Sequence, residues 1–368
     1  MYPALAVAGL LAAEHDEVLI VGTPQGLEAR LVPEAGVAFR PLRASGFDRA
    51  RPWTLVTSSA RIALSTIQAW SWMGASRPDV VIGFGGYVSI PVGLAAMLRG
   101  IPLVLHEQNS VPGLANKVLS RWASSVGVTY GESAPLMAHP DRVEVTGNPV
   151  RPAVLAADRS SGRASLALPE DALVLLVFGG SRGARHLNSA VIALRDRLMA
   201  IPSLHVVHVA GALEKDAVVT ALEAAGGDAS GRWRVLDYID DMGSALAASD
   251  IVVARAGATS IAELTALGLP TVLVPYPYAT DDHQTKNAAT MVAHGAAELV
   301  PDSEVDGERF GDVIVALLGN PSRRATMSDA SRALGRPNAA GELIALARAA
   351  AGADRNSPHH DTTEDSVA

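Results

Sequence analysis

The stretch DIVVARAGATSIAELTALGLPTVLVP, residues 250–275, decides the fold. Its apolar run 251–254 leads into Gly257, a helix-like segment follows, and a second apolar run closes the stretch at 270–275. A strand, a tight glycine turn, a helix and a second strand make a parallel β-α-β unit. Because the first turn of a helix has free N–H groups, the pattern predicts that residues 258–260 offer donors to a diphosphate.

Alternating strands and helices are predicted along the whole chain. Residues 80–109 resemble residues 251–287, because each segment runs strand, glycine, helix, strand and then a polar loop with His, Gln and Asn. This repetition favours two similar α/β domains, each with a doubly wound parallel sheet covered by helices on both faces. The other apolar runs that we predict as strands are 17–22, 79–84, 101–107, 142–147, 172–178, 204–210 and 233–238.

The segment TGNPVRPAV, residues 146–154, contains two prolines and a glycine and is the predicted domain boundary. We expect an N-terminal domain over 1–148 and a C-terminal domain over 149–335. The C-terminal domain opens with a strand and the glycine loop 179–183, whereas the first domain starts at Met1 directly in a helix. We therefore expect the corresponding strand and glycine loop of the first domain to lie upstream of this start.

Composition and charge exclude several classes of protein. The chain of 368 residues has 30 Lys or Arg and 38 Asp or Glu, and its net charge of −8 disfavours a nucleic-acid partner. The absence of cysteine excludes disulfides, thiol catalysis and cysteine metal sites, and it fits a reducing compartment. No apolar run reaches the roughly 18 residues that span a bilayer. Residues 1–17 lack the basic region of a signal peptide.

No cofactor and no protein-built metal site are expected. The adjacent acids at 240–241 and 281–282 point in different directions, and no His-x-x-x-His pair accompanies them. His359, His360 and Asp361 could bind a metal ion. They lie in the polar tail 352–368, for which we favour disorder.

Three glycine turns follow predicted strands and precede predicted helices, at 83–86, 179–183 and 257–260. None is followed by Gly-Lys-Ser/Thr, and none has the complete fingerprint of a dinucleotide site. Together, at the carboxyl ends of parallel strands, they indicate a phosphate-bearing ligand. Glu263 lies one helical turn beyond Thr259, where a carboxylate could accept hydrogen bonds from ribose hydroxyls. The alternative for Glu263 is a solvated helix residue.

Two polar loops suit a sugar. HEQNSVPGLANK, residues 106–117, and ATDDHQTKNA, residues 279–288, place amides, carboxylates and a histidine directly after predicted strands. Sugar hydroxyls need paired donors and acceptors, which these side chains supply. Ordinary polar loops are the alternative.

Segment 40–77 differs from the rest of this acidic protein. It has six arginines against one acid, Asp48, and three of the five tryptophans of the chain. Ile62, Ile67, Trp70 and Met73 are spaced to share one face of a helix. The segment predicts a patch that binds an anionic membrane surface, and a core helix with solvated arginines is the alternative.

The successive motifs GFGGYVSIP, HEQNSVPGLANK, TGNPVR, GGSRGARHLN, YIDDM, RAGATSIAE and DDHQTKNA resemble those of the MurG family of glycosyltransferases, over about residues 1–345. The resemblance implies the GT-B fold, two Rossmann-like domains facing a cleft, with a C-terminal helix over about 336–350 packing back on the first. It implies inverting transfer of N-acetylglucosamine from UDP-N-acetylglucosamine to the C4 hydroxyl of lipid I, forming lipid II for peptidoglycan. The implied location is the cytoplasmic face of the bacterial membrane, where cell-wall or division proteins are possible partners.

The resemblance also implies roles for individual residues. Ser181 would meet phosphate or nucleoside, Ile239 the uracil edge and Glu263 the ribose. Glu107 and His106 are the candidates for the general base, because the family's favoured histidine lies in the glycine loop that we expect upstream. The diphosphate would bind at Ala258, Thr259, Ser260, Ile261 and Ala262, and the sugar hydroxyls at His283 and Gln284. Asn109 and Arg151 would reach the donor from the first domain and the hinge, and the acceptor's diphosphate would lie near Gly85, Gly86 and Tyr87.

Three other functions share part of this pattern. Another GT-B transferase would share the donor motifs but should lack the motifs at 83–91 and 106–117. A UDP-N-acetylglucosamine 2-epimerase shares the fold but needs more acids in the cleft. A UDP-sugar-binding protein with little activity is the reading from a different class.

Overall fold

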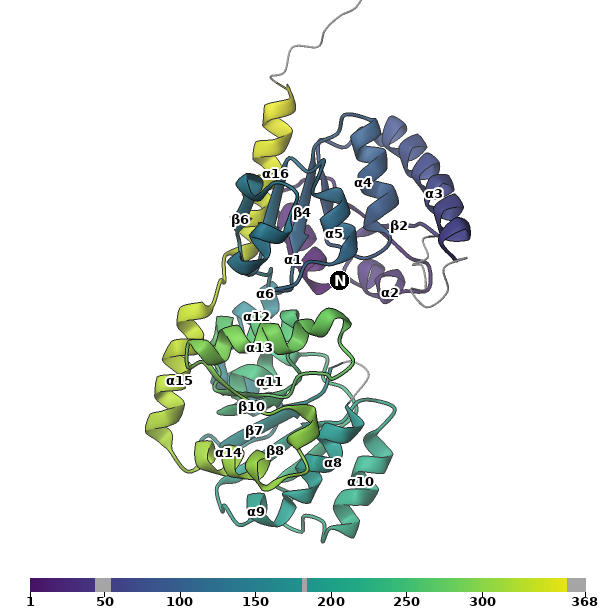
Figure 1. Cartoon of the computed structure of the whole chain (residues 1–368). Helices are drawn as coiled ribbons and strands as arrows, with labels where there is room; N and C mark the ends of the chain where they lie inside the picture. The colour runs from purple at the N-terminus through teal and green to yellow at the C-terminus, as the bar shows by residue number, and fades with distance from the viewer. Residues whose placement is uncertain (44–53, 181–183, 356–368) are drawn as a thin grey trace, which may run out of the picture.

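The computed structural model describes residues 1–43, 54–180 and 184–355. Figure 1 shows two halves stacked one above the other, each with strands at its centre and helices around them. All paired strands among the described residues run parallel. The predicted α/β class, with helix-covered parallel sheets, is confirmed.

The N-terminal half carries the strand pair β1-β2 and the four-stranded sheet β3-β4-β5-β6 among the described residues. Its core lies between this sheet and the helices on its two faces, with Val104 and Leu105 of β4 fully buried. The elements are α1 (Tyr2–Ala13), β1 (Leu19–Gly22), α2 (Glu28–Glu34), β2 (Ala38–Pro41), α3 (Thr54–Ser76), β3 (Val81–Gly83), α4 (Ser89–Leu98), β4 (Leu103–Glu107), α5 (Leu114–Leu119), β5 (Ser125–Val128), η1 (Gly131–Leu136), η2 (Pro140–Arg142) and β6 (Val143–Val145).

The C-terminal half is built on a six-stranded sheet in the order β12-β11-β10-β7-β8-β9, as far as the described residues show. Both faces of β7 and β10 are buried, which explains why their sequences are unbroken apolar runs. The elements are α6 (Pro152–Leu155), α7 (Arg159–Ser165), β7 (Leu173–Phe178), α8 (Arg185–Ala193), α9 (Arg195–Met199), β8 (Leu204–Val209), α10 (Lys215–Ala224), β9 (Trp233–Leu236), α11 (Met242–Ala248), β10 (Ile251–Ala254), α12 (Ala258–Leu267), β11 (Thr271–Leu273), η3 (Thr280–Asp282), α13 (His283–Ala293), β12 (Ala297–Leu299), η4 (Asp302–Glu304), α14 (Glu308–Leu318) and α15 (Pro321–Leu334).

The last helix, α16 (Ala339–Arg355), returns to the N-terminal half. Leu343 and Ile344 of α16 share a buried cluster with Val7 of α1 and Val104 of β4, and Figure 1 shows α16 running up beside the first sheet. The helix continues to Arg355, so residues 352–355 are helical where the sequence predicted a disordered tail. Residues 356–368 lie outside the described part of the chain.

Three strands were not predicted: β2, β5 and β12. Their sequences are Ala-Phe-Arg-Pro, Ser-Val-Gly-Val and Ala-Glu-Leu, too short and too polar to resemble a buried strand. These strands form because they pair with a neighbouring strand, and their own sequences carry no apolar pattern that would predict them.

The prediction that Ile62, Ile67, Trp70 and Met73 share one face of α3 is wrong. Met73 is buried against Ala95 and Ala96 of α4, and Ile62 is half-buried on the same side. Ile67 and Trp70 are instead 62% and 41% exposed, on the opposite side with Leu64. Apolar residues occur on both sides of α3, so spacing alone did not show which side packs. Arg49, Arg51, Trp53 and Asp48 lie outside the described residues.

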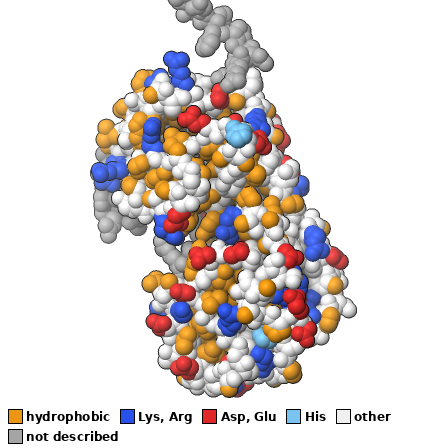
Figure 2. Space-filling view, turned by 180° about the vertical axis from the view of Figure 1, so that it is seen from behind, with side chains coloured by type: hydrophobic (Ala, Val, Ile, Leu, Met, Phe, Trp, Pro, Cys, Tyr) orange, Lys and Arg blue, Asp and Glu red, His pale blue; other side chains and the backbone are white. Residues whose placement is uncertain are grey.

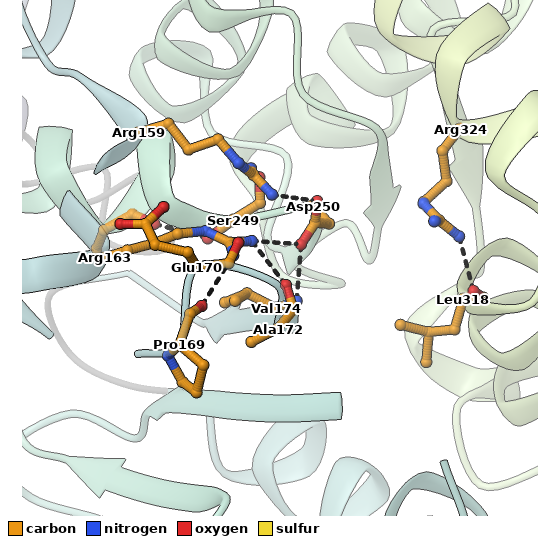
Figure 3. Close-up of polar contacts among 11 residues, drawn as sticks. Arg159, Arg163, Pro169, Glu170, Ala172, Val174, Ser249, Asp250, Leu318 and Arg324 are labelled. Carbon is orange, nitrogen blue, oxygen red and sulfur yellow. Dashed lines mark hydrogen bonds and ion pairs between the residues drawn. The ribbon is translucent and has the colours of Figure 1, made fainter. Parts of the chain in front are cut away.

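An ionic cluster lies at the amino-terminal ends of β7 and β10, opposite the glycine turns. Arg163, which is fully buried, donates to Asp250 Oδ2 at 3.1 Å and to the carbonyl oxygen of Ala172 at 2.7 Å. Arg159 Nη2 donates to the other oxygen of Asp250 at 2.6 Å, and the N–H of Val174 donates to Oδ2 at 2.8 Å. Figure 3 shows both arginines converging on this carboxylate. The cluster ties the segment before β7 to the start of β10.

Charge is spread over the surface. On the face shown in Figure 2, basic and acidic side chains are interspersed over both halves. Within the described residues, no helix is both long enough and apolar enough to cross a bilayer.

Candidate active site

The strand order of the C-terminal sheet reverses between β7 and β10, which are hydrogen-bonded neighbours with Phe178 opposite Ala254. The chain leaves β7 toward β8 on one side and leaves β10 toward β11 on the other. In open parallel sheets, ligands bind in the crevice that such a reversal opens at the carboxyl ends of the strands. Gly179 follows β7 and Gly257 follows β10, so two of the three predicted glycine turns meet at this point.

The turn after β7 needs glycine. A Cβ added to Gly179 would lie 2.2 Å from the Cβ of Ala184, and Gly180 has a φ of +95°, which side chains disfavour. Gly179 therefore lies directly against the start of α8, where a side chain has no room. Residues 181–183, including the predicted phosphate or nucleoside contact Ser181, lie outside the described residues.

The turn after β10 leaves donors free. Gly257 caps α12 in an extended conformation without a side-chain hydrogen bond. The N–H of Ile261 donates to the carbonyl oxygen of Gly257 at 2.9 Å, so the amides of residues 258–260 precede the first helical hydrogen bond. Ile261 itself packs in the core, and Ala262 packs against it. Of the predicted range 258–262, only the N–H groups of residues 258–260 precede the first helical hydrogen bond, which uses the N–H of Ile261.

Glu263 is buried and paired, not a solvated helix residue. Arg151 Nε and Nη2 donate to Glu263 Oε1 at 3.1 and 2.9 Å, and the guanidinium lies 4.5 Å from the centre of the Tyr2 ring. Burial raises the pKa of Glu263, and Arg151 opposes that shift. Burial and the neighbouring Tyr238 hydroxyl raise the pKa of Tyr2 to about 12. Four segments therefore meet here: α1 with Tyr2, the interdomain segment with Arg151, the loop after β9 with Tyr238, and α12 with Glu263.

Two polar side chains at the start of α13, those of His283 and Gln284, are held in place by hydrogen bonds. Gln284 Oε1 accepts from the N–H of Tyr276 at 2.9 Å, and His283 Nδ1 donates to the carbonyl oxygen of Thr280 at 2.7 Å. Their other polar atoms, the Gln284 amide nitrogen and His283 Nε2, have no protein partner among the described residues. Asp281 and Asp282, just before them, both have a φ of 52°, a strained conformation that is typical of functional loops.

The residue predicted to hold a uracil also leaves its backbone free. Ile239 packs partly against the core, and no hydrogen bond within the described chain uses its N–H or C=O. Asp241, two residues later, accepts the N–H of Ser244 at 3.0 Å and caps α11. Ile239 thus offers the donor and acceptor pair that an amide-like base edge requires.

Known proteins with similar sequences and folds indicate the family to which this site belongs. Residues 1–128 match the model of the glycosyltransferase family 28 N-terminal domain, and residues 174–343 match that of the glycosyltransferase family 28 C-terminal domain. A protein of Desulforudis audaxviator named UDP-N-acetylglucosamine–N-acetylmuramyl-(pentapeptide) pyrophosphoryl-undecaprenol N-acetylglucosamine transferase is 41% identical over 356 residues, 96% of this chain and 95% of that protein. A protein of the same name from Salinibacter ruber is 43% identical over 347 residues, 94% of this chain and 92% of that one.

The chain belongs to the MurG family of glycosyltransferases. The crystal structure of MurG from Acinetobacter baumannii superposes with a TM-score of 0.74 at 30% identity, covering 95% of each chain. The GT-B fold expected from the motifs is therefore confirmed.

The glycine turn of the N-terminal half lies after β3. Gly85 and Gly86 both have positive φ, +79° and +77°, and Ser89 Oγ donates to the carbonyl oxygen of Gly85 at 2.5 Å. Glycine adopts positive φ without the steric cost of a Cβ, so these two positions allow a tight turn of the backbone. Tyr87 beside them is 52% exposed. For a MurG-family chain these are the predicted contacts of the acceptor's diphosphate.

Neither predicted general base has a free proton-accepting atom. His106 is fully buried, with Nε2 donating to the carbonyl oxygen of Gly147 at 2.8 Å and Nδ1 accepting from Gln108 at 3.0 Å. Burial lowers the pKa of His106 to about 4. Glu107 is 2% exposed and accepts from the N–H of Asn109, the N–H of Gly113 and the side chain of Asn116 at 3.0, 3.0 and 2.8 Å. This geometry favours structural roles for both.

Tyr2, Asn148 and Tyr238 were not predicted for the site, and Asn287 was predicted only as part of the polar loop 279–288. Asn287 of α13 contacts Ser110 and Asn109 across the junction. Asn148 in the interdomain segment is 2% exposed, and its side-chain amide has no protein partner among the described residues. Tyr2 and Tyr238 flank the Arg151–Glu263 pair. A signal for Asn287 was present, because it belongs to the polar loop 279–288, but sequence alone does not show which residue of such a loop crosses to the other half.

Metal ligands are not grouped in the described part of the chain, where no three His, Cys, Asp or Glu side chains lie close enough to hold an ion.

Proposed function

We infer that the chain transfers N-acetylglucosamine from UDP-N-acetylglucosamine to the C4 hydroxyl of undecaprenyl-diphospho-N-acetylmuramoyl-pentapeptide, lipid I, with inversion at the anomeric carbon. The product is lipid II. The observation that carries the proposal is the uncapped start of α12 beside buried Glu263 at the strand-order reversal, in a chain 41–43% identical over nearly its whole length to transferases named for this reaction.

In this proposal the C-terminal half binds the donor. The uracil edge binds the backbone of Ile239, the ribose hydroxyls bind Glu263, and the sugar hydroxyls bind His283 and Gln284. The diphosphate lies against the N–H groups of residues 258–260, where the positive end of the α12 dipole stabilises the charge that grows as UDP leaves. The N-terminal half presents the acceptor, with its diphosphate at Gly85 and Gly86.

The C4 hydroxyl must lose a proton during transfer. His106 and Glu107 act in the proposal as structural groups, the first holding the interdomain segment at Gly147 and the second holding the loop of Asn109. Another group therefore accepts this proton.

We propose that no metal ion assists the leaving group, because the α12 amides supply the electrostatic stabilisation. The dissociation constant for UDP is expected to change less than about twofold when a chelator is added, because backbone amides bind the diphosphate without a metal ion. Isothermal calorimetry with and without EDTA measures this. A loss of binding in EDTA would contradict the proposal.

We propose that the chain binds the cytoplasmic membrane surface through the exposed side of α3 and its basic neighbours. Leu64, Ile67 and Trp70 are exposed on α3, and the guanidinium of Arg99 lies 3.6 Å from the centre of the Trp70 ring. Apolar side chains flanked by arginines suit an interface of acyl chains and anionic headgroups. Such a location brings the N-terminal half to the lipid acceptor.

Two measurements test the proposed activity. Calorimetry with UDP-N-acetylglucosamine tests the donor site, and transfer of labelled N-acetylglucosamine to a lipid I analogue tests the reaction. We expect binding and a lipid-linked disaccharide product with inverted anomeric configuration. Binding without product would favour a nucleotide-sugar-binding protein, and binding with product from a different acceptor would favour another transferase.

A further inference from the structure

One buried side chain links the two halves directly. Asn287 is fully buried, and its Oδ1 accepts two hydrogen bonds from Ser110, one from the N–H and one from Oγ, both at 3.0 Å. Its Nδ2 donates to Asn109 Oδ1 at 3.3 Å. Ser110 lies in the N-terminal half and Asn287 in the C-terminal half, 177 positions apart in sequence. A single amide thus makes three hydrogen bonds across the junction.

On the C-terminal side, Asn287 belongs to the helix that carries the proposed sugar contacts. It lies one turn beyond His283 and Gln284 on α13. Gln284 is itself held by the N–H of Tyr276. The position of Asn287 is therefore coupled rigidly to that of the side chains that would hold the donor sugar.

On the N-terminal side, Asn287 contacts a loop that is already fixed. Glu107 accepts from the N–H of Asn109 at 3.0 Å and from the N–H of Gly113 at 3.0 Å, and it accepts from Asn116 at 2.8 Å. The loop is thus wrapped around one buried carboxylate. Without Asn287, the two Ser110 donors and the side-chain oxygen of Asn109 would have no partner among the described residues.

The chemistry of these atoms explains why an amide is used. A carboxamide presents an acceptor and a donor in one plane, so it can satisfy Ser110 and orient Asn109 together. Separating the halves would expose these groups to water, so the contact favours this arrangement of the two halves by the modest net free energy of hydrogen bonds. Asn287 holds the oxygen of the Asn109 amide while Glu107 accepts from its nitrogen at 3.4 Å, so the two contacts together fix the orientation of that side chain.

We propose that Asn287 is a positioning residue that latches the two halves through Ser110 and orients Asn109 for the transfer step. The inference rests on the proposed transferase function. Asn287 touches no substrate atom in this account; it acts through Asn109 and through the relative placement of the donor and acceptor halves. Misplacement of reacting groups by about 1 Å can lower the rate on the order of 100-fold.

The first test is kinetic. Asn287→Ala is expected to lower kcat for transfer by roughly 10- to 100-fold, since reacting groups are misplaced, while the dissociation constant for UDP alone changes less than about threefold. Ser110→Ala, which removes Oγ but keeps the N–H, should lower kcat by about 3- to 10-fold. Because both changes act on one contact, the effect of Ser110→Ala should vanish in the Asn287→Ala background. Additive effects would overturn the latch.

A second measurement separates the latch from the chemistry. The chain has no cysteine, so Arg30→Cys on α2 and Glu223→Cys on α10, both at exposed positions, allow two spin labels in the full chain. UDP-N-acetylglucosamine should narrow the distance distribution between the labels, and Asn287→Ala should leave it broad. An unchanged narrow distribution in Asn287→Ala would overturn the proposal. If the unaltered chain bound the donor but transferred nothing, the proposed function would fail while this readout still decided on the latch.

The matched control is Asn320→Ala. The Asn320 side chain accepts the N–H of Arg323 at 2.9 Å and caps α15, away from the junction. Its removal should lower thermal stability without changing kcat or the label distances. If Asn287→Ala did not fold, Ser110→Ala would still give both readouts, and no effect of Ser110→Ala on either one would overturn the proposal.

Discussion

Arg151 and Glu263 lie 112 positions apart in sequence and meet at the junction, where Nε and Nη2 of the arginine donate to the same carboxylate oxygen at 3.1 and 2.9 Å. The second oxygen of Glu263 has no protein partner among the described residues. One atom of the carboxylate is thus held by the interdomain segment, and the other remains for a ribose hydroxyl.

Glu263→Gln should weaken UDP binding by about 10- to 100-fold, because hydrogen bonds to a charged acceptor contribute roughly 1.5–3 kcal/mol. The specific signature is loss of discrimination between UDP and 2′-deoxy-UDP, measured by calorimetry. Glu14→Gln, on a surface pair with Arg348, is the control and should change neither constant. Retained discrimination in Glu263→Gln would remove the ribose role.

Acid should destabilise the fold through its buried histidines. Burial lowers the pKa of His106 and of His208 from 6.5 to about 4, so the folded state binds fewer protons than the unfolded state between those values. The neutral imidazoles contribute stability that is complete above pH 6.5 and is lost as the pH falls toward 4. Each contributes a slope of at most ~1.4 kcal/mol per pH unit.

Urea unfolding at pH 7.5 and 5 measures this slope. His106→Gln with His208→Gln removes both titrating groups and should flatten the pH dependence, at a lower stability at pH 7.5. An equally steep dependence in the double variant would mean that other groups cause it.

Asp250→Ala should destabilise the C-terminal half by about 3–5 kcal/mol, because it leaves the fully buried guanidinium of Arg163 without its counter-ion. Asp312→Ala is the control: its pair with Arg197 is exposed, and its loss should change stability by less than about 1 kcal/mol. Urea midpoints followed by circular dichroism measure both. Similar small effects would show that Arg163 is held by backbone carbonyls alone.

Membrane binding should depend on the exposed side of α3. Ile67→Glu should reduce the fraction of chain that floats with vesicles containing anionic lipid by about 5- to 10-fold, since it removes apolar area and adds repulsion. Leu213→Glu is the control, because Leu213 is 85% exposed on the other half. Raising the salt concentration should also reduce binding. Equal flotation of the two variants would place the membrane contact elsewhere.

Local features of the site could be predicted from the sequence. The strand 251–254, Gly257 and the helix after it form one continuous stretch, so the free amides at 258–260 follow from local pattern alone. Glu263 was placed for the same reason, one turn along that helix. Such features depend on backbone geometry that a short segment fixes by itself.

Features that depend on the meeting of distant segments were not predictable in this way. The Arg151–Glu263 pair and the Asn287–Ser110 contact require the two halves to be oriented first. His106 and Glu107 were interpreted as candidates for the general base because the histidine that the family resemblance favours lies in the glycine loop expected upstream. Their burial and saturated hydrogen bonding become visible only when the carbonyl of Gly147 and the side chain of Asn116 are in place.

The position of α16 has a consequence for synthesis on the ribosome. Leu343 and Ile344 complete the cluster that contains Val7 and Val104, yet they are translated after the whole C-terminal half. Part of the apolar interior of the N-terminal half, which is synthesised first, therefore stays uncovered until α16 has been synthesised. A premature stop codon shortly before residue 339 would consequently damage the domain that was synthesised first.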